Sequence, residues 1–143
     1  NANGVFAEAL VRLAQITATQ ADTERASEVL SRLLGVAHAS PLSHTSILNA
    51  LDLHLRGLSI VVAGDGPDDL HDTALKTPYL DRSVRLLRAG DILDENHPAK
   101  ALAASGTGPQ ALVCAGQRCS LPVRDAEGLK AQVREMLATE AGL

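Results

Sequence analysis

The stretch LSIVVAGDG, residues 58–66, is where the pattern of the chain changes. It is a short run of aliphatic and β-branched residues that ends in glycines, which is typical of a buried strand followed by a turn. The segments before it have helical spacing, whereas those after it alternate between short strands and short helices. We therefore expect two parts, a helical segment over residues 1–56 and a small α/β module over residues 57–143.

Three helices are predicted before this strand, each with apolar residues at three- and four-residue spacing. On the first helix the apolar stripe comprises Phe6, Leu10, Leu13 and Ile16. The buried face of the second helix is expected to comprise Ala26, Val29, Leu30, Leu33 and Ala37. On the third helix, over residues 40–57, the residues that point one way are Leu48, Leu51 and Leu55.

From residue 58 onward the predicted order of elements is β-α-β-α-β-β-α. The last two strands, QALVCAG (110–116) and RCSLPVR (118–124), are expected to form a hairpin. Alternating strands and helices imply right-handed crossovers and parallel neighbours. The predicted fold class is therefore α/β, with an N-terminal three-helix segment and a small, mainly parallel sheet of about four strands that ends in one hairpin and is flanked by helices.

Charge and composition exclude several classes of partner. Lys and Arg number 13 against 17 Asp and Glu, a net charge of −4, so no broad positive field exists to attract phosphate backbones. The aromatic side chains are only Phe6 and Tyr79, too few for base stacking. No apolar run approaches the ~20 residues of a membrane span, and no secretion signal is visible. We expect neither nucleic acid nor a membrane as partner, and a cytoplasmic location.

Three stretches carry a resemblance to a known family. They are NGVFAEALVRLAQIT (3–17), IVVAGD (60–65) and, above all, ALVCAGQRCSLPVRDAEGL (111–129). In this order they resemble the C-terminal portion of the large thioredoxin-domain-containing proteins typified by bacterial YyaL and animal spermatogenesis-associated protein twenty. The most specific element is the C-x4-C-x2-P pattern within the third stretch.

The resemblance implies that the chain is part of a longer protein. Family members have an N-terminal thioredoxin-like domain, then a helical toroid similar to that of sugar epimerases and glycan-processing enzymes, then a C-terminal segment. Residues 1–56 would match the last toroid helices, and a start at Asn1 instead of Met agrees with this. No catalytic residue of the family maps onto this stretch. The implied role is a non-catalytic structural or interaction region, whose expected partners are the missing N-terminal domains or a second copy of the chain.

The only two cysteines, Cys114 and Cys119, form the first candidate site. If residues 116–117 are the centre of a type II′ turn, the two cysteines face each other at a non-hydrogen-bonded position, where a disulfide can form. In that register Pro122 faces Ala111 at a hydrogen-bonded position, so the ladder should stop or bulge there. The spacing is not C-x-x-C, and neither thiol clearly begins a helix. We expect two reduced, structural cysteines, with a redox pair as the alternative.

The turn AGDGPDDLHD, residues 63–72, is the second candidate site. It follows a strand expected to be parallel, at the edge of the sheet where ligands collect. The residues that would line a ligand site there are Asp65, Gly66 and Asp68. However, the run lacks a phosphate-binding glycine motif, and its carboxylates would repel phosphate. Helix capping and a solvated turn are the simpler interpretation, with a ligand-binding α/β module as the alternative.

No metal, cofactor or catalytic constellation is predicted. The two cysteines lack a second pair of ligands, and no metal-binding spacing joins the histidines, which are His38, His44, His54, His71 and His97. No nucleophile motif of the G-x-S-x-G type occurs. The expected function is thus a non-catalytic interaction region, with a small thiol–disulfide protein or a ligand-binding module as alternatives.

Overall fold

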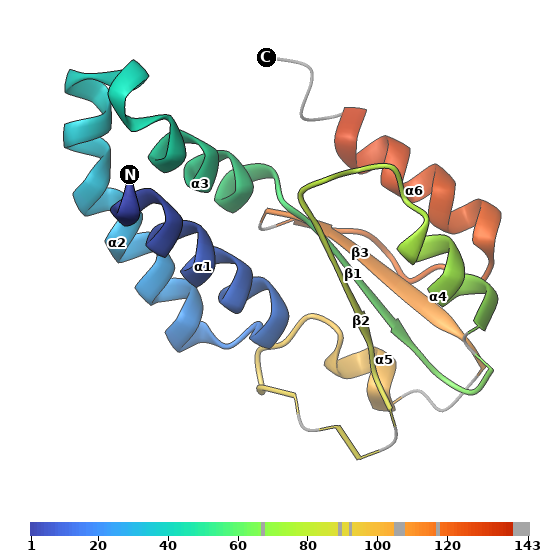
Figure 1. The fold of residues 1–143 in the computed structure, drawn as a ribbon. Helices are drawn as coiled ribbons and strands as arrows, with labels where there is room; N and C mark the ends of the chain where they lie inside the picture. The colour runs from blue at the N-terminus through green and yellow to red at the C-terminus, as the bar shows by residue number, and fades with distance from the viewer. Residues whose placement is uncertain (67, 89, 92, 105–107, 117, 139–143) are drawn as a thin grey trace. The chain divides into compact units, whose positions relative to one another are not determined.

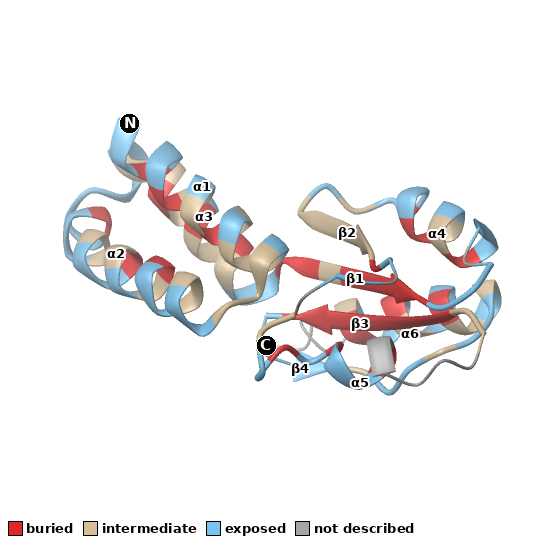
Figure 2. Ribbon diagram, turned by 90° about the horizontal axis from the view of Figure 1, so that it is seen from below, coloured by how far each residue is buried: buried red, intermediate tan, exposed pale blue. Residues whose placement is uncertain are grey.

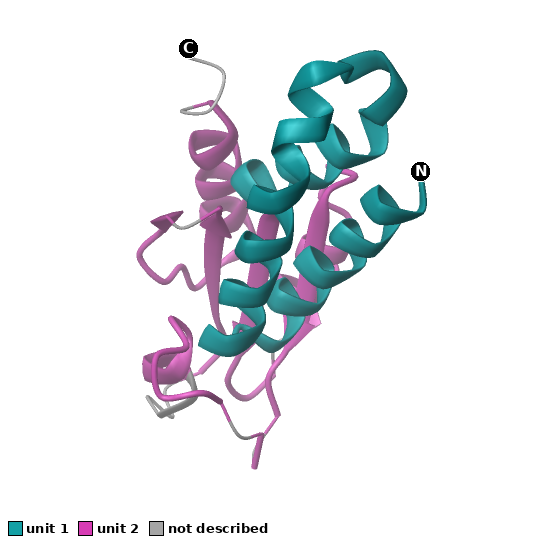
Figure 3. Ribbon diagram, turned by 90° about the vertical axis from the view of Figure 1, so that its left-hand side faces the viewer, with its two compact units in different colours: residues 1–57 teal, residues 58–143 magenta. Residues whose placement is uncertain are grey.

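The computed structural model describes residues 1–66, 68–88, 90–91, 93–104, 108–116 and 118–138. The chain divides into two compact units, residues 1–57 and residues 58–143 (Figure 3). Unit 1 is built from helices, whereas unit 2 contains a sheet with helices around it. The change of pattern at Leu58 therefore coincides with the first residue of the second unit.

Unit 1 contains α1 (Ala2–Thr17), α2 (Gln20–Ala39), the 3₁₀ turn η1 (Pro41–His44) and α3 (Thr45–Arg56). α1 packs against both α2 and α3. The shared core is aliphatic, as a chain with so few aromatic residues requires, and consists of Ala7, Val11, Ala26, Leu30, Ala50 and Leu53. The segment predicted as one third helix is split, because residues 41–44 form a 3₁₀ turn before α3 begins.

Side-chain hydrogen bonds hold the turn between α1 and α2. Thr19 caps α2 by accepting a hydrogen bond from the Asp22 N–H at 3.2 Å. The Asp22 carboxylate in turn accepts from the hydroxyls of Thr17 at 2.7 Å and Thr19 at 2.8 Å. Because these two hydrogen bonds stabilise the charged form, they lower the pKa of Asp22. The short connection makes α1 and α2 a helical hairpin.

Unit 2 contains a four-stranded sheet in the order β2-β1-β3-β4 (Figure 1). Its strands are β1 (Leu58–Ala63), β2 (Arg82–Leu86), β3 (Gln110–Ala115) and β4 (Arg118–Cys119). β1 and β2 are parallel, whereas β3 is antiparallel to both β1 and β4. The α/β class, the N-terminal helices and the C-terminal hairpin are thus confirmed, but the mainly parallel sheet is wrong.

The connection between β2 and β3 accounts for the direction of β3. In its described part, this connection carries only the short helix α5 (Lys100–Ala104). The prediction of parallel neighbours assumed a full crossover helix that returns the chain to the end of the sheet where it started. Without such a helix, the chain enters β3 from the end where β1 finishes, since Ala63 pairs with Gln110.

The two faces of the sheet are covered by different elements. Residues alternate along β1, so that every second side chain points to the same face. One face packs against α4 (Asp68–Leu75) and α6 (Ala126–Ala138), as Figure 1 shows, through Leu70, Ala74, Leu129, Val133 and Met136. The other face, which we call the second face, buries Val61, Ala63, Leu112 and Cys114 against Leu87, Ala99 and Leu102.

Candidate functional site

Cys114 of β3 and Cys119 of β4 form a disulfide. They are register partners across the hairpin, as predicted, and their Cα atoms are 4.0 Å apart. Gly116 has a φ of 54°, which the first residue of a primed turn requires, while Gln117 lies outside the described residues. The expectation of two reduced cysteines is wrong for this structure, because the tight hairpin places the two side chains directly opposite each other.

The two sulfur-bearing residues lie in different environments. Cys114 is 7% exposed and belongs to the apolar cluster on the second face of the sheet. Cys119, in contrast, is exposed on the two-residue edge strand β4. A thiol in solution could therefore approach Cys119 but not Cys114.

The hairpin changes register immediately after the disulfide. Ser120 still pairs with Val113, accepting the Val113 N–H through its hydroxyl at 3.2 Å and donating its own N–H to the Val113 carbonyl at 2.8 Å. Ala111, however, pairs with Val123 and not with Pro122. Because Pro122 has no N–H to donate at the expected position, the chain bulges by one residue, as the sequence predicted.

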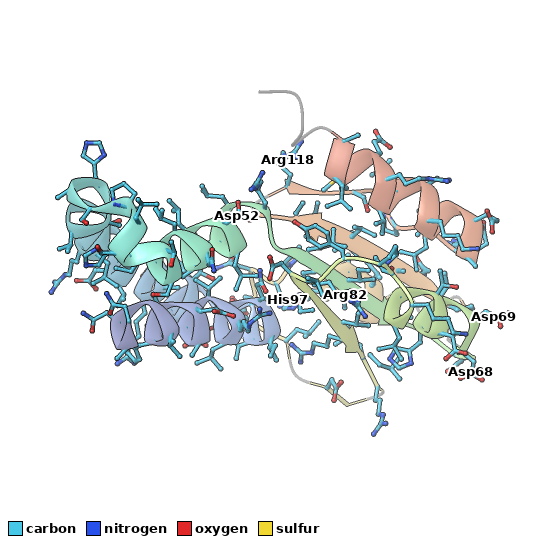
Figure 4. All side chains as sticks on the ribbon, turned by 45° about the horizontal axis from the view of Figure 1, so that its top comes forward. Asp52, Asp68, Asp69, Arg82, His97 and Arg118 are labelled. Atoms are coloured by element: carbon cyan, nitrogen blue, oxygen red, sulfur yellow. A yellow bond between two sulfur atoms is a disulfide. The ribbon has the colours of Figure 1, made fainter. Side chains whose placement is uncertain are left out.

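The acidic turn after β1 is exposed. Asp65, Gly66 and Asp68 all lie at the surface, and Asp68 is the first residue of α4. Figure 4 shows Asp68 and Asp69 together at the beginning of this helix, pointing outward. Two carboxylates in the first turn of a helix stabilise its positive end. The turn thus has the geometry of a solvated helix start.

Close backbone contact fixes the start of this turn. Gly64 has a φ of 105°, and a Cβ at this position would lie 2.7 Å from the carbonyl carbon of Gly108. Only glycine fits both the dihedral angle and the space. The turn is therefore shaped by packing of two backbone segments.

His97 is a buried polar residue that the sequence did not single out. It is 4% exposed, and its Nδ1 accepts a hydrogen bond from the Ala99 N–H at 3.0 Å. Burial lowers the pKa of His97, the nearby Arg85 lowers it further, and Asp94 opposes both effects. The neutral imidazole acts as an N-cap for the helical turn that leads into α5. The signal in the sequence is that His97 directly precedes Pro98, because proline is common at the first position of a helix.

The described ranges contain neither a metal-binding group nor a membrane-spanning helix. No three side chains of His, Cys, Asp or Glu come together there as a metal ion would require. Among the helices of the same ranges, none is both long enough and apolar enough to cross a bilayer.

α1 has apolar residues on two opposite sides. Its inner side packs against α2 and α3 through small residues, of which Gly4, Ala7 and Val11 are buried. Its opposite side is exposed, at 63% for Val5, 53% for Phe6, 44% for Leu13 and 56% for Ile16. Ala2 and Ala9, which are also exposed, complete this side. Figure 2 shows exposed positions along α1 in pale blue. We call this side the outer stripe of α1, which consists of Ala2, Val5, Phe6, Ala9, Leu13 and Ile16.

The outer stripe contains three of the four residues predicted as the apolar stripe of the first helix. Leu10 is partly buried, but Phe6, Leu13 and Ile16 are exposed. On α3, Ile47, Ala50 and Leu53 are buried, whereas of the three predicted residues Leu48 and Leu51 are partly buried and Leu55 is 57% exposed. For α2 the prediction holds, with Ala26, Leu30 and Ala37 buried. The intramolecular core of unit 1 thus uses small residues of α1 and leaves its larger ones outside.

The sequence-predicted sites of unit 2 lie at different ends of the sheet. Cys114 pairs with Ser59 near the start of β1, whereas Asp65 follows the end of that strand. The structure therefore joins the two cysteines with each other but does not bring them to the acidic turn. No family model matches the chain, and neither a curated protein nor a solved structure matches it.

Proposed function

We propose that the chain is a non-catalytic interaction region, and that its helical unit docks through the outer stripe of α1. The observation that carries this proposal is the exposure of four large apolar side chains along one side of a single helix. Contiguous apolar surface of this kind marks interaction sites in folded proteins. The expected partners are another copy of the chain or further helices of a longer protein.

The packing of unit 1 supports a docking role for this stripe. The inner side of α1 already fills the groove between α2 and α3, so the outer stripe is not needed for the core of the unit. A helix that is apolar on two opposite sides is typical of a helix packed between neighbours on both sides. The outer stripe would supply the second set of contacts.

Variants of the stripe test this proposal. We expect Phe6→Ser and Leu13→Ser to abolish concentration-dependent association, measured by sedimentation velocity over a range of protein concentrations. Both side chains are about half exposed, so the helical content measured by circular dichroism should stay the same. The matched control is Leu121→Ser in unit 2, an 83% exposed leucine outside the stripe, which should sediment like the wild type.

Two results would count against this function. The first is a wild-type chain that remains monomeric at every concentration. The second is an association that persists unchanged in both stripe variants, since another surface would then be responsible.

A second candidate function is thiol–disulfide exchange at Cys119. The specific observation in its favour is the contrast between the exposed Cys119 and the buried Cys114. An external thiolate would attack the Cys119 sulfur, the bond to Cys114 would break, and the Cys114 thiolate would leave and take up a proton. Because Cys114 lies among apolar residues, it is a poor leaving group, and we rank this function below docking.

Mass spectrometry after incubation with glutathione tests the exchange function. A functional pair would give a mixed disulfide at Cys119 within minutes in the folded chain. If the adduct forms only after denaturation, the disulfide is structural and the exchange function is wrong.

The family resemblance and the cytoplasmic location belong to the same proposal. A thioredoxin-like domain and further helical hairpins encoded upstream of Asn1 would support the resemblance. Because the cytosol keeps thiols reduced, a cytoplasmic protein should carry Cys114 and Cys119 as free thiols in the cell. Alkylation of intact cells before lysis distinguishes the two states.

A further inference from the structure

The outer stripe has the spacing of a coiled-coil seam. Its residues at positions 2, 6, 9, 13 and 16 follow one another at intervals of four, three, four and three. This is the a and d pattern of a heptad, with Phe6 and Leu13 at a positions and Ala9 and Ile16 at d positions. A seam of this kind accepts another helix that runs nearly parallel or antiparallel to α1.

We propose that the occupant of the outer stripe is the α1 helix of a second copy of this chain, packed antiparallel. This inference rests on the proposed docking function and names its partner. Antiparallel packing pairs each a position with a d position, so Phe6 faces Ile16 and Ala9 faces Leu13 of the other copy. The two-fold axis crosses α1 near residue 11, and each contact therefore occurs twice.

Side-chain size favours the antiparallel arrangement. With the helices antiparallel, the small Ala9 receives the large Leu13 of the other copy, and the layers interdigitate. With the helices parallel, Ala9 would face Ala9 and leave a gap between a layer of two phenylalanines and a layer of two leucines. The sequence of the stripe is thus complementary to itself only when one helix is reversed.

Charge also favours this arrangement. Antiparallel helices place the positive end of one macrodipole beside the negative end of the other. Beside the seam, Arg12 forms an ion pair with Glu8 of its own helix at 2.9 Å. Within each copy, Glu8 therefore balances the positive charge of Arg12, and this charge does not oppose the approach of a second copy.

The area of the stripe sets the expected strength of the pair. At their present exposure, the stripe residues offer roughly 400 to 500 Å² per copy, so a pair would bury roughly 800 to 1,000 Å², the size of a weak or transient interface. Phe6, the only phenylalanine of the chain, is the aromatic anchor. The pair should therefore form and dissociate with concentration.

Cysteine cross-linking tests the orientation directly. Chains carrying Ala9→Cys and chains carrying Leu13→Cys are oxidised separately and as an equal mixture, and the linked peptides are identified by mass spectrometry. We expect the mixture to give links between positions 9 and 13 several-fold faster than either variant links to itself. In the antiparallel pair, two copies of position 9 are offset by about 6 Å along the helix axis.

A size exchange gives an independent test without new thiols. Ala9→Leu should weaken association, because the new leucine meets Leu13 of the other copy. Leu13→Ala should also weaken it, and the double variant Ala9→Leu/Leu13→Ala should restore it at least partly. In a parallel pair, Ala9→Leu would instead fill the gap and strengthen association.

The outcomes separate this inference from the proposed function. If the stripe variants abolish association but cross-links join like positions, or if Ala9→Leu strengthens association, the docking function stands and the antiparallel pair is wrong. If the chain is monomeric at all concentrations, a second copy is not the occupant of the stripe, and the antiparallel pair is wrong.

Discussion

Gly4 of α1 and Ser46 of α3 are in close contact: a Cβ at position 4 would lie 2.5 Å from the Ser46 Cβ and 2.6 Å from its carbonyl carbon. Gly4 therefore allows the two helices to approach. We expect Gly4→Ala to lower the free energy of unfolding of unit 1 by about 1 to 3 kcal/mol, because α1 and α3 must separate.

Gly35 of α2 provides the matched control for this change. A Cβ there would meet nothing within 4 Å. Gly35→Ala should therefore stabilise unit 1 by about 0.5 to 1 kcal/mol through the higher helix propensity of alanine. Equal effects of the two substitutions on thermal unfolding would show that α1 and α3 do not approach as described.

The disulfide between Cys114 and Cys119 should stabilise unit 2 modestly. It closes a short loop, with a sequence separation of 5 residues, so the chain-entropy estimate of its contribution is about 2 kcal/mol. Reduction with dithiothreitol should lower the melting temperature of the wild type. The double variant Cys114→Ala/Cys119→Ala should melt at the lower temperature with or without the reductant, and a response of this variant to dithiothreitol would contradict the assignment.

His97 should make the stability of unit 2 sensitive to mild acid. Burial and Arg85 lower its pKa in the folded state, whereas in the unfolded chain it is near the ordinary value of about 6.5. Below that pH the imidazole of His97 binds a proton more readily in the unfolded chain than in the folded one. The folded state is therefore fully stabilised above about pH 6.5 and loses this stabilisation as the pH falls through the folded pKa of His97. We expect the free energy of unfolding to decrease as the pH falls below about 6.5.

His97→Asn separates this effect from that of other groups. Asparagine keeps an acceptor for the Ala99 N–H but does not titrate. Urea unfolding at a series of pH values should give a flatter pH dependence for this variant. Parallel curves for the variant and the wild type would show that His97 does not carry the effect.

The sequence predicted the hairpin better than the helix faces, for physical reasons. A two-residue turn fixes the pairing of Cys114 with Cys119, and the missing N–H of Pro122 requires the bulge beside Ala111. Spacing shows that a disulfide can form there but does not encode whether two facing thiols are oxidised, so the preferred prediction of reduced cysteines is wrong.

Helix periodicity locates apolar sides but does not say which of two sides is inside. On α2 one side is apolar, and its buried residues Ala26 and Leu30 were predicted. α1 is apolar on both sides, and the side with the larger residues was wrongly predicted to be the buried one. Close packing of α1 against its neighbours instead places small residues such as Gly4 and Ala7 inside. The direction of β3 was also missed, since its preceding connection lacks a full crossover helix in the described residues.

The molar mass of the chain in solution, measured by light scattering over a dilution series, tests the docking of α1 most directly. For a chain of 14.9 kDa, we expect the mass to rise with concentration toward twice this value for the wild type and to stay at the monomer value for Leu13→Ser. A wild-type mass that stays at 14.9 kDa at every concentration would contradict the account.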